Sequence, residues 1–198
     1  MRRTDYILRN WRYRKVEPYI PFGCALADIG GLDGSLLMRL YNKIEKGVCI
    51  DPLIEEKKDG KIEFIKYRIT DKLPLPDSSF DVATMLAVYE HLGDSRELVA
   101  SEISRILRPD GIALLTVPDS AVDHILKVLI KLRLIDGMSF EEHGHFDSAD
   151  TIAIFEKYGF KLRRQVKFQL GLNNLFVFEK GEAPQPEADG RKAAQKAP

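Results

Sequence analysis

The feature that most constrains the fold is the stretch ALADIGGLDGSLL at residues 25–37. It begins as an apolar strand, passes through a turn with three glycines, and ends in the apolar-periodic start of a helix. Glycine lets such a turn bend sharply and approach a ligand closely, because a Cβ atom there would clash. We therefore expect Asp28, at the tip of the strand, to lie beside a ligand.

Short apolar strands and amphipathic helices alternate along the chain, a pattern typical of parallel βα units. Strands are predicted at residues 24–30, 47–51, 61–67, 80–88 and 111–117, with two further β-like stretches, 160–170 and 174–180, that favour an antiparallel hairpin. Helices are predicted at residues 4–16, 34–45, 121–135 and 150–158. One more helix is expected to open with a capping box, in which Asp94 is the N-cap and Glu97 lies three residues on.

Length and charge restrict the class of protein. The 198 residues suit one α/β domain, and the 30 basic residues balance the 30 acidic ones, so the basic excess of a nucleic-acid binder is missing. No apolar run has the length of a signal peptide or a membrane span, which predicts a cytoplasmic protein. Residues 181–198 contain no large apolar side chain and are predicted to be a disordered tail behind a domain of residues 1–180.

The second strand ends in Asp51, where a carboxylate can accept hydrogen bonds from two ribose hydroxyls. Together with the glycine-rich turn, this predicts a ligand that contains adenosine. The dinucleotide fingerprint G-x-G-x-x-G does not fit, because aligning its last two glycines with Gly31 and Gly34 places the first on Ile29. Asp28 would repel a pyrophosphate and attract an ammonium or sulfonium group, which favours S-adenosylmethionine over a nicotinamide dinucleotide.

Four segments occur in the order found in one family: ADIGGLDG, GVCIDP, LPLPDSSFDVATMLAVYEHL and ISRILRPDGIALLTVP. On these segments, residues 19–180 resemble a class I S-adenosylmethionine-dependent methyltransferase of the small type 11 group. The resemblance implies a Rossmann-like, doubly wound sheet of seven mostly parallel strands with an antiparallel edge strand. It also implies methyl transfer from S-adenosylmethionine, with S-adenosylhomocysteine as the product.

The resemblance also implies the residues that bind the cofactor. Asp28 and the turn glycines would hold the methionine part, Asp51 the ribose, and the main chain of Ile69 the adenine. The expected cofactor-binding residues are Asp28, Gly30, Gly31, Gly34, Asp51, Ile69 and Leu86. The family commonly has D-x-G-x-G-x-G, and here Leu32 occupies the middle glycine position.

The catalytic base is unknown, and the candidates are three histidines. His91 and its neighbour Glu90 follow the fourth strand on the side where open α/β sheets bind ligands. His143 and His145 belong to the segment EEHGHFD, which lacks further ligands with metal-site spacing, so no metal is expected. For His91, packing in a loop is an equally good explanation.

Two basic segments allow other interpretations. The predicted helix at residues 121–135 is packed on the sheet, or forms a lid over an apolar substrate, or contacts a membrane surface. The N-terminal arginines, interleaved with Tyr6, Trp11 and Tyr13, suggest either an RNA contact or a solvated helix face. We expect a small-molecule acceptor, and neither nucleic-acid nor membrane contact; the oligomeric state is unknown. The alternatives are a non-catalytic adenosylmethionine-binding protein, a nicotinamide-dependent oxidoreductase and an interaction module.

Overall fold

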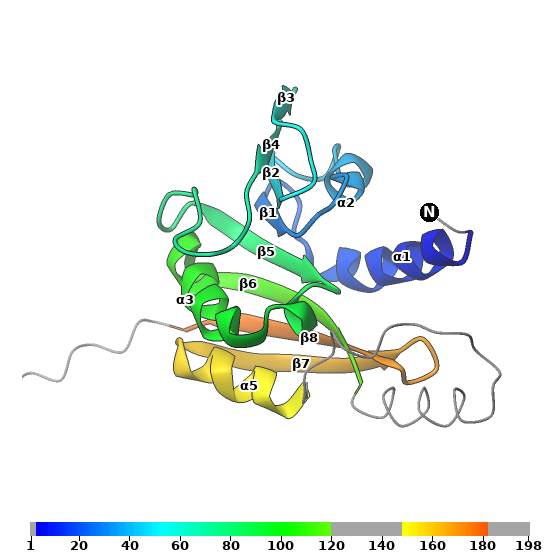
Figure 1. The fold of residues 1–198 in the computed structure, drawn as a ribbon, viewed down its shortest axis with the longest axis vertical. Helices are drawn as coiled ribbons and strands as arrows, with labels where there is room; N and C mark the ends of the chain where they lie inside the picture. Colours follow the sequence, from blue (N-terminus) through cyan, green and yellow to red (C-terminus); the bar gives the residue numbers. More distant parts are fainter. Residues whose placement is uncertain (1–2, 120–147, 182–198) are drawn as a thin grey trace, which may run out of the picture.

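The computed structural model describes residues 3–119 and 148–181, which form one eight-stranded sheet flanked by helices (Figure 1). The predicted helix at 121–135, His143, His145 and the tail beyond Gly181 lie outside the described residues. The strands are β1 (Ala25–Ile29), β2 (Lys46–Asp51), β3 (Lys57–Asp59), β4 (Ile62–Lys66), β5 (Phe80–Leu86), β6 (Leu107–Pro118), β7 (Phe160–Phe168) and β8 (Asn173–Lys180). The α-helices are α1 (Arg3–Val16), α2 (Ser35–Arg39), α3 (Arg96–Ile106) and α5 (Ser148–Lys157), and 3-10 turns cover Glu17–Tyr19, Tyr89–His91 and Gly93–Ser95.

The order of the strands creates a crevice at the centre of the sheet. The order is β3-β4-β2-β1-β5-β6-β8-β7, and β1 pairs in parallel with both β2 and β5. The chain therefore leaves β1 toward one edge and later returns to the other side of β1. In open α/β sheets, ligands bind outside the carboxyl ends of the strands at such a reversal.

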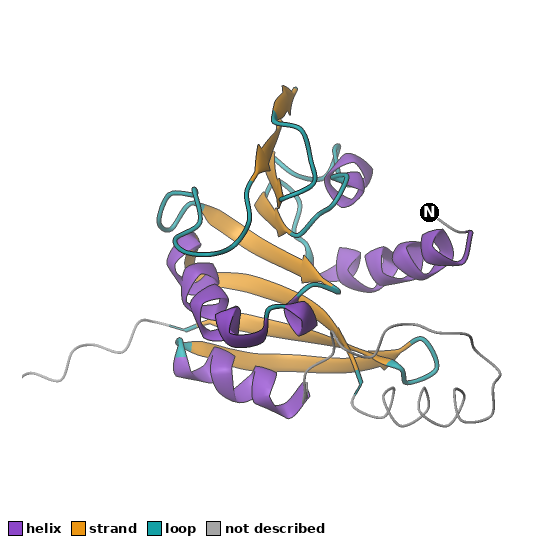
Figure 2. Cartoon of the chain, viewed as in Figure 1, coloured by secondary structure: helices purple, strands orange, loops and turns teal. Residues whose placement is uncertain are grey.

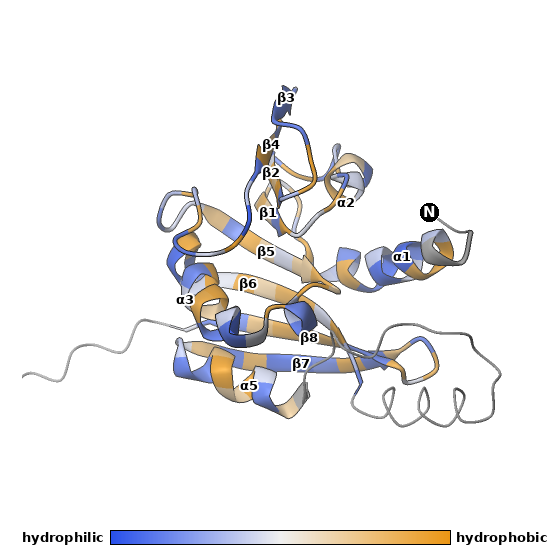
Figure 3. Cartoon of the chain, in the orientation of Figure 1, coloured by the Kyte–Doolittle hydropathy of each residue, from blue (hydrophilic) through white to orange (hydrophobic). Residues whose placement is uncertain are grey.

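Successive side chains of a strand point to opposite faces of the sheet, and each face is covered by different helices. One cluster joins Ala27 and Ala83 to α3 and α5, and the other joins Leu26 and Val82 to α1 and α2. Figure 2 shows the helices lying along the sheet, and Figure 3 shows apolar residues concentrated in β5, β6 and β8. The prediction of a doubly wound sheet is confirmed.

The predicted strand count is one too low. The additional strand is β3, which pairs antiparallel with β4 through a turn at Gly60 and Lys61. The other edge agrees with the prediction: β8 pairs antiparallel with β6, and β7 pairs antiparallel with β8. β1, β2, β4, β5 and β6 pair in parallel, so the sheet is mixed with antiparallel edges.

Two predicted helices begin or end elsewhere. The helix predicted at 34–45 ends at Arg39, because the N–H of Glu45 donates to the carbonyl of Cys24 and draws the chain back to the sheet. The predicted capping box is wrong: α3 begins at Arg96 without a side-chain cap, and Glu97 instead bonds Lys157 Nζ at 2.7 Å. Within the described ranges, no helix has the length and apolarity needed to cross a membrane.

Candidate active site

Asp28 is buried at the carboxyl end of β1, with 3% of its surface exposed. It is in register with Thr84 of β5, so the two side chains face the same side of the sheet, and Thr84 Oγ1 donates to Asp28 Oδ1 at 2.7 Å. No hydrogen bond from the described residues reaches Asp28 Oδ2. Burial raises the pKa of Asp28 to about 6. Within the described residues, the hydrogen bond from Thr84 offsets the cost of burying this charge only in part.

The turn after β1 has no room for side chains at two of its glycines. A Cβ atom on Gly31 would lie 2.5 Å from Asp28 Oδ2 and 2.6 Å from Cys49 Sγ, and one on Gly30 would lie 2.5 Å from Val88 Cγ2. Leu32, where the family pattern has glycine, has a left-handed φ of 53°. The backbone conformation that favours glycine is therefore kept despite the leucine side chain.

Asp51 ends β2 beside this turn, and it already has hydrogen-bond partners. Its Oδ2 accepts the N–H of Leu32 at 3.0 Å, and its Oδ1 accepts the N–H of Leu53 at 2.8 Å. A ligand is therefore not the sole hydrogen-bond partner available to this carboxylate. Each carboxylate oxygen has two lone pairs, so both oxygens retain acceptor capacity.

Two adjoining hollows lie over the carboxyl ends of β1, β2 and β5. The first, about 430 Å³, is lined by Asp28, Gly31 and Leu86 among others. The second, about 410 Å³, is lined by Ile69 and by Tyr67. Their shared lining residues are Gly30, Asp51, Leu53, Val88 and His91. The structure thus brings most of the predicted cofactor-binding residues together around one elongated depression.

The two predicted residues still to be placed are Gly34 and His91. Gly34 lines neither hollow; it is the N-cap of α2, with φ 68°, and packs so closely on Phe64 that a Cβ would lie 2.3 Å from Cε1. His91 lines both hollows. Of the three histidine candidates, it is the one that lies within the described residues.

Sequence reasoning missed the contribution of α1 to this site. Arg9, Arg12 and Tyr13 line the first hollow from the face of α1 that packs on the sheet. Tyr13 Oη lies 2.8 Å from Ser35 Oγ, and Arg9 donates to Asp33 Oδ2 at 2.8 Å. The spacing of three and four residues placed these side chains on one helical face, but it did not indicate what that face covers.

Arg12, which lines the first hollow, interacts electrostatically with the buried carboxyl group of Glu90. Arg12 Nε is buried and has no hydrogen-bond partner among the described residues, and the same is true of Glu90 Oε2. Burial lowers the pKa of Arg12, while Glu90 partly offsets this effect. Burial raises the pKa of Glu90 to about 7. The guanidinium of Arg12 thus has donor capacity beside the first hollow.

The two hollows lie at the strand-order reversal of a doubly wound α/β sheet, which is where proteins of this class bind their ligands. Residues 7–165 match the family described as a methyltransferase domain. That match covers most of the chain, so the chain belongs to the methyltransferase domain family. The predicted methyltransferase family and the cofactor of that family, S-adenosylmethionine, are therefore confirmed.

Known proteins agree with this assignment. A 55-residue stretch is 48% identical to a probable S-adenosylmethionine-dependent methyltransferase of Mycolicibacterium smegmatis, covering 28% of this chain and 21% of that protein. The fold is similar to a methyltransferase of Haloferax volcanii solved with the Trm112 methyltransferase activator, with TM-score 0.68, 17% identity, and 87% and 91% of the two chains covered. It is also similar to a SAM-dependent methyltransferase of Methanosarcina mazei, with TM-score 0.63, 21% identity, and 85% and 98% covered.

Proposed function

We propose that this chain binds S-adenosylmethionine along the two adjoining hollows and catalyses methyl transfer to a small-molecule acceptor. The observation that carries the proposal is the buried carboxylate of Asp28, which lines the first hollow together with the turn glycines and two arginines of α1. When bound, the cofactor supplies a methyl group that is activated by its attachment to a sulfonium sulfur.

The first hollow fits the amino-acid end of this cofactor. Asp28 has a free acceptor oxygen for an ammonium group, and this interaction would offset the cost of burying its charge. Arg12 has free donor capacity for a carboxylate. Gly31 lacks the Cβ that would lie 2.5 Å from Asp28 Oδ2 and crowd this acceptor oxygen. The opposite charges of an α-amino acid thus meet complementary charges on the protein.

The second hollow suits the nucleoside end. Asp51 would accept hydrogen bonds from the ribose hydroxyls. Each of its oxygens accepts one backbone N–H, from Leu32 or Leu53, and keeps a further lone pair. Ile69 and Tyr67 provide apolar surface where an adenine ring would lie. His91, which lines both hollows, is the group that we propose to orient the acceptor or take its proton.

Calorimetric titration with paired ligands tests the assignment. S-adenosylhomocysteine carries both ends, whereas 5′-methylthioadenosine lacks the amino-acid end and NAD carries a pyrophosphate. We expect binding in the order S-adenosylhomocysteine, methylthioadenosine, NAD. Equal affinity for S-adenosylhomocysteine and methylthioadenosine would contradict binding of the amino-acid end by Asp28 and Arg12. Preferred binding of NAD would favour an oxidoreductase.

Turnover separates an enzyme from a protein that only binds the cofactor. Incubation with labelled S-adenosylmethionine and a fractionated metabolite pool should move the label into a small molecule. Binding without any label transfer to small molecules, lipids, protein or RNA would support the non-catalytic alternative.

A further inference from the structure

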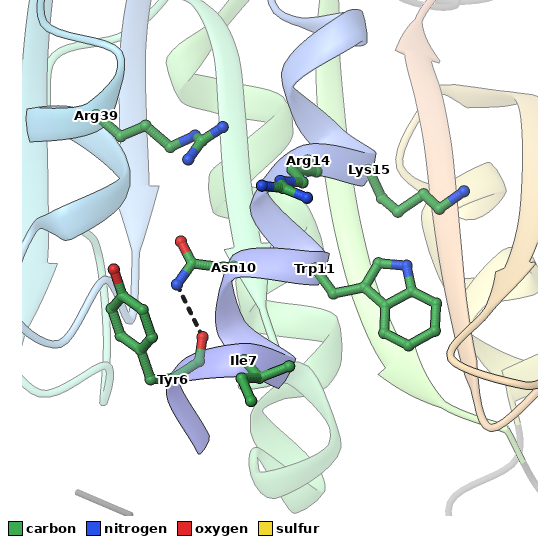
Figure 4. A pocket seen from close by; sticks show the side chains of 7 residues that line it. All are labelled: Tyr6, Ile7, Asn10, Trp11, Arg14, Lys15 and Arg39. Carbon is green, nitrogen blue, oxygen red and sulfur yellow. Dashed lines mark hydrogen bonds between the residues drawn. The ribbon is translucent and has the colours of Figure 1, made fainter. Parts of the chain in front are cut away.

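The outer face of α1 carries two rows of side chains, because residues four apart lie on the same side of a helix (Figure 4). Their members are Tyr6, Asn10 and Arg14 in one row and Ile7, Trp11 and Lys15 in the other. Together with Arg39 of α2 they border a hollow of about 700 Å³. We call these two rows the outer face of α1. It lies outside the depression assigned to the cofactor.

Large apolar side chains are exposed on and beside this face. The exposed fractions are 57% for Tyr6, 62% for Ile7, 41% for Leu8 and 39% for Trp11. Leu170, at the turn between β7 and β8, is 94% exposed, and the neighbouring Gln169 donates Nε2–H to the carbonyl of Leu8 at 2.9 Å. That bond holds the turn against α1. A contiguous exposed apolar surface of this kind is typical of an interaction site.

The charge of the same face is positive. Arg14 and Lys15 form no ion pair with any described residue. Two carboxylates that contact α1 or the hollow's rim are already paired, Glu17 with Arg39 at 2.9 Å and Asp33 with Arg9 at 2.8 Å. The face therefore complements an anionic partner.

We infer that the outer face of α1, with Leu8 and Leu170, docks the protein on an anionic lipid bilayer. Trp and Tyr rings favour the headgroup level, aliphatic side chains insert beyond it, and Arg and Lys pair with lipid phosphates. A nucleic acid would stack on Trp11 and Tyr6 and pair with the cations, but it would leave Ile7, Leu8 and Leu170 in water. The aliphatic side chains decide between the two partners. This inference departs from the expectation, drawn from the sequence, of no membrane contact.

Docking would place the cofactor site near the membrane surface. α1 carries Arg12 and Tyr13 at the first hollow and Trp11 on its outer face. The same helix therefore borders the proposed cofactor site and the proposed docking surface. An acceptor delivered from the bilayer is a consequence that rests on the proposed function. The docking itself requires no cofactor and is tested separately.

Trp11 is the single tryptophan of the chain, so its fluorescence reports on this face directly. The full-length protein is titrated with vesicles of equal parts phosphatidylglycerol and phosphatidylcholine. We expect a blue shift of the emission, protection from iodide quenching, and reversal by high salt; phosphatidylcholine vesicles alone should give a much smaller response. An unchanged spectrum with anionic vesicles would overturn the inference. Quenching by oligouridylate with no vesicle response would assign the face to nucleic acid.

Charge variants with a matched control localise the contact. Arg14→Glu combined with Lys15→Glu should weaken vesicle binding at least tenfold in a sedimentation assay, since each cation near an anionic surface contributes on the order of 1 kcal/mol. Lys58→Glu combined with Lys161→Glu makes the same charge change on β3 and β7 and should leave vesicle binding near that of the wild type. Both proteins should keep the wild-type affinity for S-adenosylhomocysteine, which shows that they are folded. Equal losses in the two double variants would contradict docking by α1.

Discussion

Asp28 lies buried at the carboxyl end of β1, where Thr84 Oγ1 donates one hydrogen bond to it. Burial raises its pKa from the ordinary value of 3.8 to about 6. A carboxyl whose pKa is raised by folding contributes stability that is complete below about pH 3.8 and is lost as the pH rises through about 6. At neutral pH, the ionised group therefore destabilises the ligand-free protein.

The isosteric variant Asp28→Asn should separate stability from ligand binding. We expect its free energy of unfolding at pH 7 to rise by about 1 to 3 kcal/mol, because no charge is buried while the bond from Thr84 is retained. Its affinity for S-adenosylhomocysteine should fall at least tenfold, and its affinity for methylthioadenosine should change little. Denaturant unfolding and calorimetry measure the two effects. A variant that binds S-adenosylhomocysteine as the wild type does would contradict the role of Asp28.

Asp51 should affect both ligands alike, because both contain ribose. Asp51→Ala is expected to weaken binding of S-adenosylhomocysteine and methylthioadenosine by about 1.5 to 3 kcal/mol, or roughly ten- to a hundredfold. Since the carboxylate also accepts the N–H groups of Leu32 and Leu53, a loss of stability of about 1 kcal/mol should accompany it. Asp51→Asn, which keeps an acceptor oxygen, is the control for folding. Loss of one ligand alone would contradict the ribose assignment.

The residues that the sequence located are those at the ends of strands. Asp28 and Asp51 each end an apolar run, and parallel pairing of β1 with β2 places such ends side by side. Arg12 could not be located in this way, because its position depends on how α1 crosses the sheet. The two backbone bonds of Asp51 were equally hidden, since they depend on the path of the turn at Leu32.

At the scale of elements, the turn between β1 and α2 is the part of the site where we expect substitutions to be tolerated least. Gly31→Ala should cost stability and ligand affinity together, because the added Cβ would lie 2.5 Å from Asp28 Oδ2. We expect a loss of about 1 to 3 kcal/mol in the free energy of unfolding. Gly23→Ala is the matched control: Gly23 has φ 70° with no atom within 4 Å of its Cβ position, so only backbone strain should result. If both variants kept the wild-type affinity for S-adenosylhomocysteine, the close approach at Gly31 would have no functional role.

The two faces of α1 should be separable by single substitutions of the same type. Arg12→Gln is expected to weaken S-adenosylhomocysteine binding about ten- to a hundredfold, because a charged hydrogen bond to the ligand carboxylate is lost. Arg14→Gln, two residues on and on the outer face, should leave that affinity unchanged and weaken binding to anionic vesicles. Calorimetry and vesicle sedimentation on both variants provide the comparison. If both variants changed S-adenosylhomocysteine affinity and vesicle binding to the same extent, the two faces of α1 would not have separate roles.

Elements were predictable where local pattern and tertiary burial agree. The strands that became β1, β2, β5 and β6 are apolar runs buried on both faces, and their pairing followed from βα alternation. The helix expected at 34–45 failed because the apolar spacing of Leu40 and Ile44 reflects burial in the core and not continued helix. β3 was missed because its three residues are all exposed and polar, so no apolar alternation marks a strand before the turn at Gly60 and Lys61.

At the scale of the whole molecule, a ligand bound at the reversal of strand order around β1 should stabilise the entire fold. S-adenosylhomocysteine should stabilise the folded chain by mass action, by about 2.7 kcal/mol at a hundred times its Kd. For a domain of this size, that gain corresponds to a rise in Tm of roughly 5 to 10 °C. Differential scanning fluorimetry measures it, with NAD as the control ligand. No shift at saturating ligand would contradict an adenosine pocket.

The size of that shift should depend on pH through Asp28. In the ligand-free protein, stability falls as the pH rises through about 6, because Asp28 ionises in a buried position that the bond from Thr84 compensates only in part. A bound ammonium group lowers the pKa of Asp28, so the complex does not share this loss, and the ligand-induced rise in Tm should grow between about pH 5 and pH 7.5. Glu90, whose pKa burial raises to about 7, titrates in an overlapping range, and Glu90→Gln removes its contribution. In Asp28→Asn, the rise in Tm should be small and nearly independent of pH. A wild-type shift that is equal at both ends of this range would show that Asp28 does not bind the ammonium group.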